Sequence, residues 1–485
     1  MDAEAFRRFG YELIDWVADY LQNAERYPVF SPLSPGEVRR RLPTGPPLSG
    51  EPMEAILKDF QEIILPGITH WNHPRFFAYF PANNSAPSIL GELLAAGLGV
   101  NSMVWQSSPA ATELEEVVMD WLRQMVGLPR EFRGVIQDTA STATLCALLC
   151  AREKLAQFQI NQEGFSGWSG KKAPRVYASS EAHSSVEKGV KIAGLGARNL
   201  VPVMVDKTYA MDPRDLERKI RADQEQGFSP CCVVATVGTT SSTALDSLKS
   251  IGEITQRYGL WFHVDAALAG SAAILPEMRW ILDGIESADS LVFNPHKWLF
   301  TNFDCSAFFC RHPQTLTATF AIHPEYLKTD RDQEVTNFRD WGIQLGRRFR
   351  ALKLWFVLRT YGVQDLQQML REHLALAQEF KGWVEESLDF EALAPVPLNT
   401  ICFRFHPGKH SSCTLSAEEL DGLNKALQDE VNHSGRIFLT STRLSGTFCL
   451  RLCIGQTQTR REHVVQAWEA LQGSQVVRER RQRTR

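Results

Sequence analysis

Three consecutive apolar segments, each typical of a buried strand, lead directly into polar residues that could do chemistry. CCVVAT (231–236) leads into Thr239 and Thr240, LWFHV (260–264) ends at Asp265, and SLVF (290–293) is followed by Asn294, His296 and Lys297. Each intervening segment is long enough for a crossover helix, so the strands are predicted to run parallel. Ligands of open α/β sheets bind outside the carboxyl ends of such strands. We therefore expect a ligand site built from these turns.

An acid at one strand end and a lysine just past the next suit one cofactor particularly well, pyridoxal phosphate. Its aldehyde needs a lysine to form a Schiff base, and its ring nitrogen needs a buried carboxylate to stay protonated. Lys297 and Asp265 are predicted to fill these two roles.

Two further segments supply what the rest of such a cofactor requires. GVIQDTASTATLCALLCARE (134–153) reads as strand, small polar turn and helix, with Thr139, Ala140 and Ser141 at the junction, where backbone N–H groups can bind a phosphate. His183 follows the strand-like RVYA (175–178) and could lay its imidazole on the cofactor ring.

Each of these residues also has an ordinary structural interpretation. An Asp after a strand is often a helix cap, a lone Lys is usually solvated, and a Ser/Thr-rich turn is commonly only a cap. His183 could be a structural histidine, and His296 could equally cap the turn of Lys297. The order of the parts at successive strand ends favours the functional interpretation. The sequence has no HExxH, GxGxxG, GxxxxGK[ST] or GxSxG motif, so zinc, dinucleotide, P-loop and hydrolase chemistry lose their usual support, and no metal site is predicted.

Around these turns the sequence predicts three regions. Residues 1–82 form an N-terminal segment, with an apolar helical stripe over 4–24 and a Pro- and Gly-rich extended connection over 27–52. Residues 83–367 alternate short β-branched runs with helical segments, which predicts a large α/β domain with a mainly parallel sheet. Residues 368–485 predict a smaller α+β domain.

Composition narrows the class of protein further. A chain of 485 residues is longer than a domain with a single hydrophobic core usually is, so more than one domain is expected. A net charge of −4 provides no positive electrostatic field that would attract nucleic acid. The chain opens without a secretory signal, and no apolar run approaches the ~18 residues of a membrane span, so we expect a soluble, cytoplasmic protein without a membrane partner. Ten cysteines without a CxxC pair are expected to be reduced and mostly buried. The Arg-rich end, 478–485, is expected to be a solvated, frayed tail without a function.

The sequence resembles a known family, the pyridoxal-phosphate group II decarboxylases, and within it the aromatic-L-amino-acid (DOPA, tryptophan, tyrosine) decarboxylases. The resemblance covers nearly the whole chain and is most specific where NPHKW accompanies HVDAA. It implies the PLP fold type I (aspartate aminotransferase-like) and a homodimer whose N-terminal segments wrap the partner. The motifs that carry it are THWNHPRFFAYFP (69–81), VWQSSPAATELE (104–115), GVIQDTAS (134–141), AHSSVEK (182–188), ATVGTT (235–240), HVDAALAGSA (263–272), NPHKW (294–298) and LGRRFRALKLWFVLR (345–359).

The resemblance also implies roles for individual residues. It makes Lys297 the Schiff-base lysine, Asp265 the partner of the ring nitrogen and His183 the residue stacked on the ring. Ala140, Ser141 and Asn294 match residues around the phosphate, and Thr240, Ala267 and His296 match further cofactor or substrate contacts. The aromatic substrate pocket is implied for Trp71, Tyr79, Phe80 and Pro81, with Asn101 and Met103 expected from the partner subunit.

One position departs from the family pattern. A tyrosine on a mobile loop usually supports protonation of the decarboxylated product in this family, whereas the corresponding loop, 330–346, carries Phe338, which has no proton to give. Relatives with Phe at this position often use O2 as co-substrate and release an aromatic aldehyde, ammonia and peroxide.

The leading hypothesis is therefore PLP-dependent decarboxylation of an aromatic L-amino acid (DOPA, tryptophan, tyrosine, phenylalanine or 5-hydroxytryptophan) to the arylalkylamine and CO2. The aldehyde-forming reaction is the alternative. An inactive dimeric scaffold is a remote third, because Lys297 and Asp265 are both present. An aminotransferase or aldolase is disfavoured by NPHKW together with AHSSVEK.

Overall fold

The chain forms two compact units in the computed structural model. The model describes residues 1–168, 172–322, 325, 330–409 and 415–484. The first unit contains Met1–Pro81, Leu376–Leu393 and Ile401–Arg485, and the second contains Ala82–Ala375 and Ala394–Thr400. The N-terminal segment thus shares a unit with the C-terminal region, whereas the sequence predicts two separate regions there; that three-part division stays a prediction.

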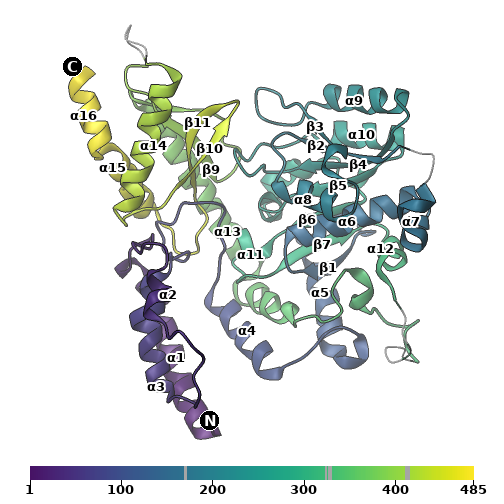
Figure 1. Cartoon of the computed structure of the whole chain (residues 1–485), viewed down its shortest axis with the longest axis horizontal. Helices are drawn as coiled ribbons and strands as arrows, with labels where there is room; N and C mark the ends of the chain where they lie inside the picture. The colour runs from purple at the N-terminus through teal and green to yellow at the C-terminus, as the bar shows by residue number, and fades with distance from the viewer. Residues whose placement is uncertain (169–171, 323–324, 326–329, 410–414, 485) are drawn as a thin grey trace. The chain divides into compact units, whose positions relative to one another are not determined.

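The second unit is built on a seven-stranded sheet in the order β1-β7-β6-β5-β4-β2-β3 (Figure 1). Neighbouring strands from β3 to β6 pair in parallel, and β7 pairs antiparallel with both β6 and β1. The predicted α/β fold with a mainly parallel sheet is confirmed. The strands are β1 (Arg133–Gln137), β2 (Pro174–Ser179), β3 (Leu200–Val203), β4 (Ser229–Thr236), β5 (Trp261–Asp265), β6 (Ser290–Phe293) and β7 (Ser306–Cys310).

Helices cover both faces of this sheet. Side chains of successive strand residues point to opposite faces. In β5, His263 contacts Thr144 of α6, whereas Phe262 lies against Gly252 of α10, so α6 and α10 lie on opposite faces. The helices of this unit are α4 (Ala86–Leu98), α5 (Pro109–Met125), α6 (Ala140–Leu155), α7 (Gln159–Glu163), α8 (Ser184–Ile192), α9 (Pro213–Glu225), α10 (Leu248–Tyr258), α11 (Pro295–Trp298), α12 (Pro313–Phe320) and the first part of α13 (Arg350–Glu386).

Strands covered on both faces must be apolar along their whole length. β5 and β6 are buried at every residue, which explains why their sequences are continuous apolar runs rather than alternating ones. The helix read from SSPAATELEE is also found: Ser108 caps α5 by accepting a hydrogen bond from the Ala111 N–H at 3.2 Å, and Gly127 follows its end with a φ of 74°.

The first unit combines helices with a four-stranded sheet in the order β10-β11-β9-β8. Its strand pairs β8–β9 and β10–β11 are antiparallel, and with α14 and α15 they give the C-terminal region the predicted α+β character. The elements are α1 (Ala3–Gln22), α2 (Glu37–Arg41), α3 (Met53–Asp59), β8 (Phe390–Ala392), β9 (Thr400–Phe405), α14 (Ala417–His433), β10 (Thr440–Leu444), β11 (Thr447–Cys453), α15 (Arg461–Gln472) and α16 (Gln475–Thr484).

The Arg-rich end of the chain differs from the expectation of a frayed tail, because it forms helix α16. The carboxylate of Glu430 accepts hydrogen bonds from the backbone N–H groups of Gln475 (2.6 Å) and Val476 (3.1 Å), which satisfies donors that a helix start leaves unpaired. An ion pair of 2.7 Å between Arg481 and Asp389 holds the helix further along.

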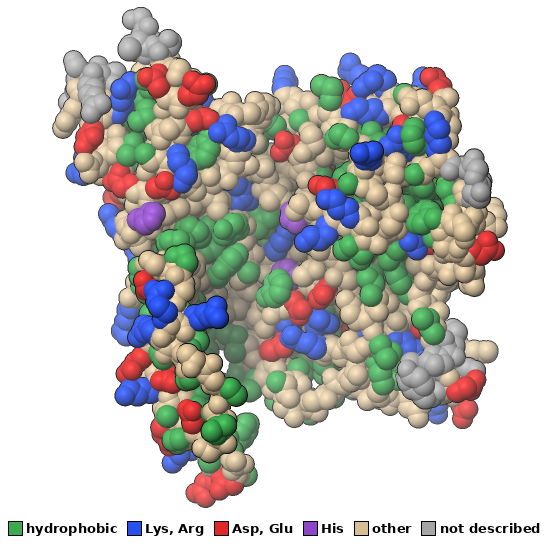
Figure 2. Space-filling view, viewed as in Figure 1, with side chains coloured by type: hydrophobic (Ala, Val, Ile, Leu, Met, Phe, Trp, Pro, Cys, Tyr) green, Lys and Arg blue, Asp and Glu red, His purple; other side chains and the backbone are tan. Residues whose placement is uncertain are grey.

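The N-terminal helix α1 has the predicted apolar stripe, yet much of that stripe faces solvent. Phe9 is buried, whereas Phe6 and Leu13 keep 68% and 41% of their surface exposed. Hydrophobic side chains are visible along the N-terminal helices in Figure 2. No helix among the described residues is both long and apolar enough to cross a membrane.

Candidate functional site

The site begins with strands β4, β5 and β6, which are neighbours in the sheet and parallel. Their carboxyl ends therefore share one edge, as the sequence predicted. Asp265 is the last residue of β5, and Asn294 directly precedes α11, which carries His296 and Lys297. Strand β1 is parallel to β6, since both pair antiparallel with β7, so the turn at Thr139 lies at this edge as well.

Backbone hydrogen bonds join the turns that follow β5 and β6. The Ala266 N–H donates to the Val292 carbonyl and the Asn294 N–H donates to the Ala267 carbonyl, each at 2.9 Å. The Ser306 hydroxyl then donates to the side-chain oxygen of Asn294 at 2.6 Å. Three predicted cofactor contacts, Asp265, Ala267 and Asn294, are thus held in a single rigid arrangement.

Asp265 places a buried carboxylate in this arrangement. Its residue surface is 4% exposed, and its Oδ1 accepts a hydrogen bond from the Ala267 N–H at 3.1 Å. No other hydrogen bond to this carboxylate comes from the part of the chain that the structure describes. Burying a carboxylate that still has an oxygen free to accept a hydrogen bond costs free energy, unless a positively charged group donates to it. The protonated ring nitrogen of pyridoxal phosphate is such a donor, so this residue fits the predicted cofactor.

His183 lies within electrostatic range of both Asp265 and Lys297. Desolvation lowers the pKa of His183, the charge of Lys297 lowers it further, and Asp265 opposes both effects. His183 also caps α8, because its Nδ1 accepts a hydrogen bond from the Ser185 N–H at 3.2 Å. The neutral ring therefore carries its proton on Nε2. His183 thus caps a helix and is also the residue predicted to contact the cofactor ring.

The predicted phosphate turn is an ordered helix start. Thr139 caps α6, and its Oγ1 accepts a hydrogen bond from the Thr142 N–H at 3.4 Å. Ala140 and Ser141 form the first turn, where backbone N–H groups have no partner within the helix, and Ser141 is exposed. The arrangement fits a phosphate group.

The turn after β4 brings Thr240 to the same edge. Gly238 adopts a φ of 87°, and a Cβ at this position would lie 2.9 Å from the Cβ of Ala269, so only glycine fits. Thr239 is buried and its Oγ1 accepts a hydrogen bond from the Ala244 N–H at 3.0 Å, whereas Thr240 is exposed. Thr239 therefore stabilises the turn, and Thr240 is accessible to a ligand.

His296 is a buried, neutral neighbour of Lys297. Burial and, to a lesser extent, the charge of Lys297 lower the pKa of His296 to about 3, although the charge of Asp304 acts in the opposite direction. Its Nδ1 accepts a hydrogen bond from the Cys305 N–H at 2.9 Å, so the ring proton is on Nε2. This contact fixes the ring and supports the structural interpretation of His296, while a cofactor or substrate contact stays a prediction.

Asn83 is a residue that sequence reasoning missed. It is buried, and it binds the backbone of the lysine and of the residue before it: its backbone N–H donates to the His296 carbonyl and its side chain donates to the Lys297 carbonyl, each at 3.0 Å. Its only signal in the sequence is its position just past the motif that ends at Pro81.

The residues predicted for the aromatic substrate pocket fall in both units. Trp71, Tyr79, Phe80 and Pro81 belong to the first unit, where the rings of Trp71 and Tyr79 stack with centroids 5.6 Å apart. Asn101 and Met103 belong to the second, where Asn101 accepts a hydrogen bond from the Arg347 N–H at 2.9 Å. The pocket stays a prediction.

Phe338 lies in the hydrophobic core of the second unit. It is 2% exposed, its ring meets that of Trp341 edge-on at 5.6 Å, and the Arg347 guanidinium lies 5.0 Å from its centroid. None of the ring contacts described for Phe338 involves Lys297, Asp265 or His183. A role in the chemistry would require this residue to leave the core, and that role also stays a prediction.

The chain is similar to known proteins over nearly its whole length. Residues 35–406 match the family model described as the pyridoxal-dependent decarboxylase conserved domain. The chain is 43% identical to tyrosine decarboxylase 4 of Petroselinum crispum, over 97% of this chain and 93% of that protein. It is 42% identical to the phenylacetaldehyde synthase of Arabidopsis thaliana, over 97% and 96%. The solved structure of Oryza sativa TDC with PLP and tryptamine superposes with a TM-score of 0.94 at 36% identity, over 99% of each chain.

The buried His263, two residues before Asp265, should make the stability of the folded protein depend on pH. Burial lowers the pKa of His263 to about 4. Because the folded pKa lies below the ordinary 6.5, the folded state takes up fewer protons than the unfolded chain as the pH falls, and stability is lost below about pH 6.5. Between pH 7 and pH 5 this residue should account for about 2 kcal/mol of lost free energy of unfolding.

Denaturant unfolding at both pH values measures the loss, and His263→Gln should reduce it by about that amount. The same substitution at the exposed His312 is the control, since water can solvate a charged ring there. An equal pH dependence in wild type and His263→Gln would show that His263 does not titrate in this way.

Proposed function

The chain belongs to the pyridoxal-dependent decarboxylases, and from that premise we propose that it converts an aromatic L-amino acid to the arylalkylamine and CO2. The observation that carries this proposal is the buried Asp265 within electrostatic range of His183, which also senses the charge of Lys297. Relatives named as tyrosine, tryptophan and aromatic-L-amino-acid decarboxylases support the substrate class. DOPA, tyrosine, tryptophan, phenylalanine and 5-hydroxytryptophan are the candidate substrates.

Each part of the cofactor would be bound by different residues of the site. Asp265 would hold a proton at the ring nitrogen, Lys297 would bind the aldehyde carbon, and the first turn of α6 with Asn294 would bind the phosphate. Pyridoxal phosphate supplies a ring that accepts the electron pair left when the carboxylate departs. His183, neutral with its proton on Nε2, could then donate that proton or place a water that does.

The proposal is tested by incubating the purified holoenzyme with each candidate amino acid while measuring CO2, amine, aldehyde and peroxide together. We expect CO2 and amine from at least one aromatic amino acid and neither from glutamate. Lys297→Ala should abolish turnover while far-ultraviolet circular dichroism stays unchanged. CO2 release by Lys297→Ala at the wild-type rate would contradict the role of this lysine.

Asp265→Asn should lower kcat by several orders of magnitude, because a neutral amide cannot keep the ring nitrogen protonated. Each tenfold loss corresponds to ~1.4 kcal/mol of transition-state stabilisation. Cofactor content should be measured by absorbance in the same sample, so that weaker binding is separated from slower chemistry. A cofactor-loaded Asp265→Asn variant with near-normal kcat would refute the assignment.

A second candidate function is formation of an aromatic aldehyde. Phe338 stands where the family resemblance expects a tyrosine, and a relative 42% identical is named phenylacetaldehyde synthase. In this reaction the amino acid, O2 and water give the aldehyde, CO2, ammonia and hydrogen peroxide. O2 accepts two electrons and is reduced to peroxide, and water supplies the aldehyde oxygen.

Phe338→Tyr should therefore raise the amine-to-aldehyde ratio and lower peroxide in step, because it places a hydroxyl at the predicted proton-delivering position. Product analysis under air with phenylalanine or tyrosine measures both quantities. Phe165→Tyr, at a partly exposed ring elsewhere in the same unit, is the matched control and should change neither. If Phe338→Tyr leaves ratio and rate unchanged, another group donates the proton.

The homodimer and the cytoplasmic location belong to the same proposal. Besides α1, helix α4 exposes Leu90, Leu93, Leu94 and Leu98, each 46% to 62% exposed and spaced along one face. Such a face favours burial against a second copy of the chain. Nine of the ten cysteines are free and buried, as a reducing compartment favours, and Cys413 lies outside the described residues.

A further inference from the structure

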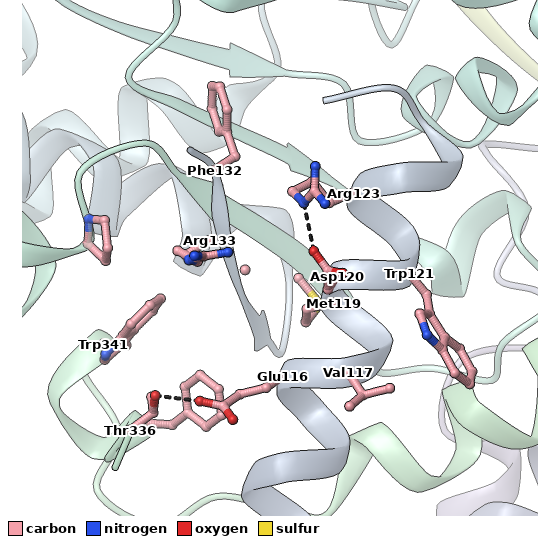
Figure 3. A pocket seen from close by; sticks show the side chains of 13 residues that line it. Glu116, Val117, Met119, Asp120, Trp121, Arg123, Phe132, Arg133, Thr336 and Trp341 are labelled. Atoms are coloured by element: carbon pink, nitrogen blue, oxygen red, sulfur yellow. Dashed lines mark hydrogen bonds and ion pairs between the residues drawn. The ribbon is translucent and has the colours of Figure 1, made fainter. Parts of the chain in front are cut away.

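A cavity of about 560 Å³ lies in the second unit, at the start of β1. Its walls come from α5, from residues 132–134, from the start of α12 and from residues 336–341 (Figure 3). Its size falls within the range of about 300 to 1,000 Å³ that is usual for small-molecule sites. We refer to it as the β1 cavity.

The β1 cavity is separate from the predicted cofactor site. Arg133 and Gly134 line it, and they are the first two residues of β1. Since β1 is parallel to β6, the start of β1 lies at the sheet edge opposite the one that carries Asp265 and Thr139. A strand of five residues that rises ~3.3 Å per residue is roughly 16 Å long, so the two edges are separated by about this distance along β1.

The lining of the β1 cavity is rich in aromatic rings. Phe132 and Phe338 are buried in its wall, whereas the rings of Trp121 and Trp341 are partly exposed. Val117 and Met119 of α5 add aliphatic surface. Rings of this kind bind a planar aromatic group by stacking and edge-on contact.

One cation in the lining lacks a close acidic partner. Arg133 is exposed, and no carboxylate of the described residues lies within 4.0 Å of its guanidinium. Asp120 is the acid it influences: burial raises the pKa of Asp120, but hydrogen bonds from Arg123 and Gln124 and the charges of Arg123 and Arg133 hold it below its usual value. Asp120 is thus already paired on its own helix, at 2.8 Å from Arg123.

The remaining acid in the lining, Glu116, accepts a hydrogen bond from the hydroxyl of Thr336 (Figure 3). This contact joins α5 to the segment that carries Phe338. Asp120 and Glu116, the two acids of the lining, are therefore both already bound to other residues of the wall. Arg133 is left as the group that can receive a ligand anion.

We propose that the β1 cavity binds a small aromatic carboxylate, with its carboxylate on Arg133 and its ring against the partly exposed ring of Trp341. Arginine binds carboxylates through two parallel hydrogen bonds, which gives both strength and orientation. The ligand needs no amino group, because no acidic side chain of the lining is left to receive one.

The proposed ligand would also act on the decarboxylase site, and this part rests on the proposed function. Phe338 and Trp341 lie in the same short helical segment as Arg339, whose N–H donates to the Met103 carbonyl at 3.0 Å. Asn337 accepts a hydrogen bond from the Trp105 N–H at 2.9 Å. A ligand that holds Phe338 and Trp341 therefore also fixes the segment that carries Met103, one of the predicted substrate contacts. We expect it to lower kcat by restricting the movement of this segment and of Met103.

Isothermal titration of the holoenzyme with 3-phenylpropionate tests the binding site. The titration is done with 2-phenylethylamine at saturation, so that the predicted substrate pocket is filled. We expect one binding event, weakened at least tenfold in Arg133→Gln. Arg130→Gln, at an arginine three residues away whose side chain is 90% exposed, is the matched control and should keep the wild-type affinity.

Several results would overturn the proposal. They are an absence of binding at millimolar concentration, equal affinity in wild type and Arg133→Gln, equal loss in Arg130→Gln, or equally tight binding of the neutral 3-phenylpropanamide. For the second part, 3-phenylpropionate should lower kcat in wild type at saturating substrate but not in Arg133→Gln. Binding without any change in kcat would show that the β1 cavity does not act on the reaction.

Discussion

The whole site depends on one constraint, that the turns after β5 and β6 are joined by backbone hydrogen bonds. The bonds from Ala266 to Val292 and from Asn294 to Ala267 set the distance between the buried carboxylate and the helix that carries the lysine. Backbone bonds depend on no side chain, so pocket residues can change between relatives without moving these groups.

Much of this framework could be predicted from the sequence because its signals are local. Asp265 and Lys297 each follow a continuous apolar run, and runs of that kind mark parallel strands buried on both faces. The strand order could not be predicted, since β7 lies between β1 and β6 through pairings between distant residues. The support that Asn83 gives to His296 and Lys297 is equally non-local, joining residues more than two hundred positions apart.

Phe338 shows a different limit of sequence reasoning. A resemblance identified the position and its unusual residue, but only the structure shows the ring buried against Trp341 and under Arg347. The β1 cavity was missed for a related reason. Its walls come from residues 116–134, Pro313 and 336–341, and no single segment contains a recognisable pattern.

The pairing of β1 with β7 has a consequence for the way the chain folds. Arg133 pairs with Cys310 and Gln137 with Ser306, and β1 has no other strand neighbour among the residues that the structure describes. During synthesis β1 therefore has no strand partner until β7 has left the ribosome, although the Ile136 N–H can already donate to the Glu115 carboxylate. Contacts of such long sequence separation slow folding and expose strand edges to aggregation. The phosphate turn and the β1 cavity, at the two ends of this strand, would become complete only at that late stage.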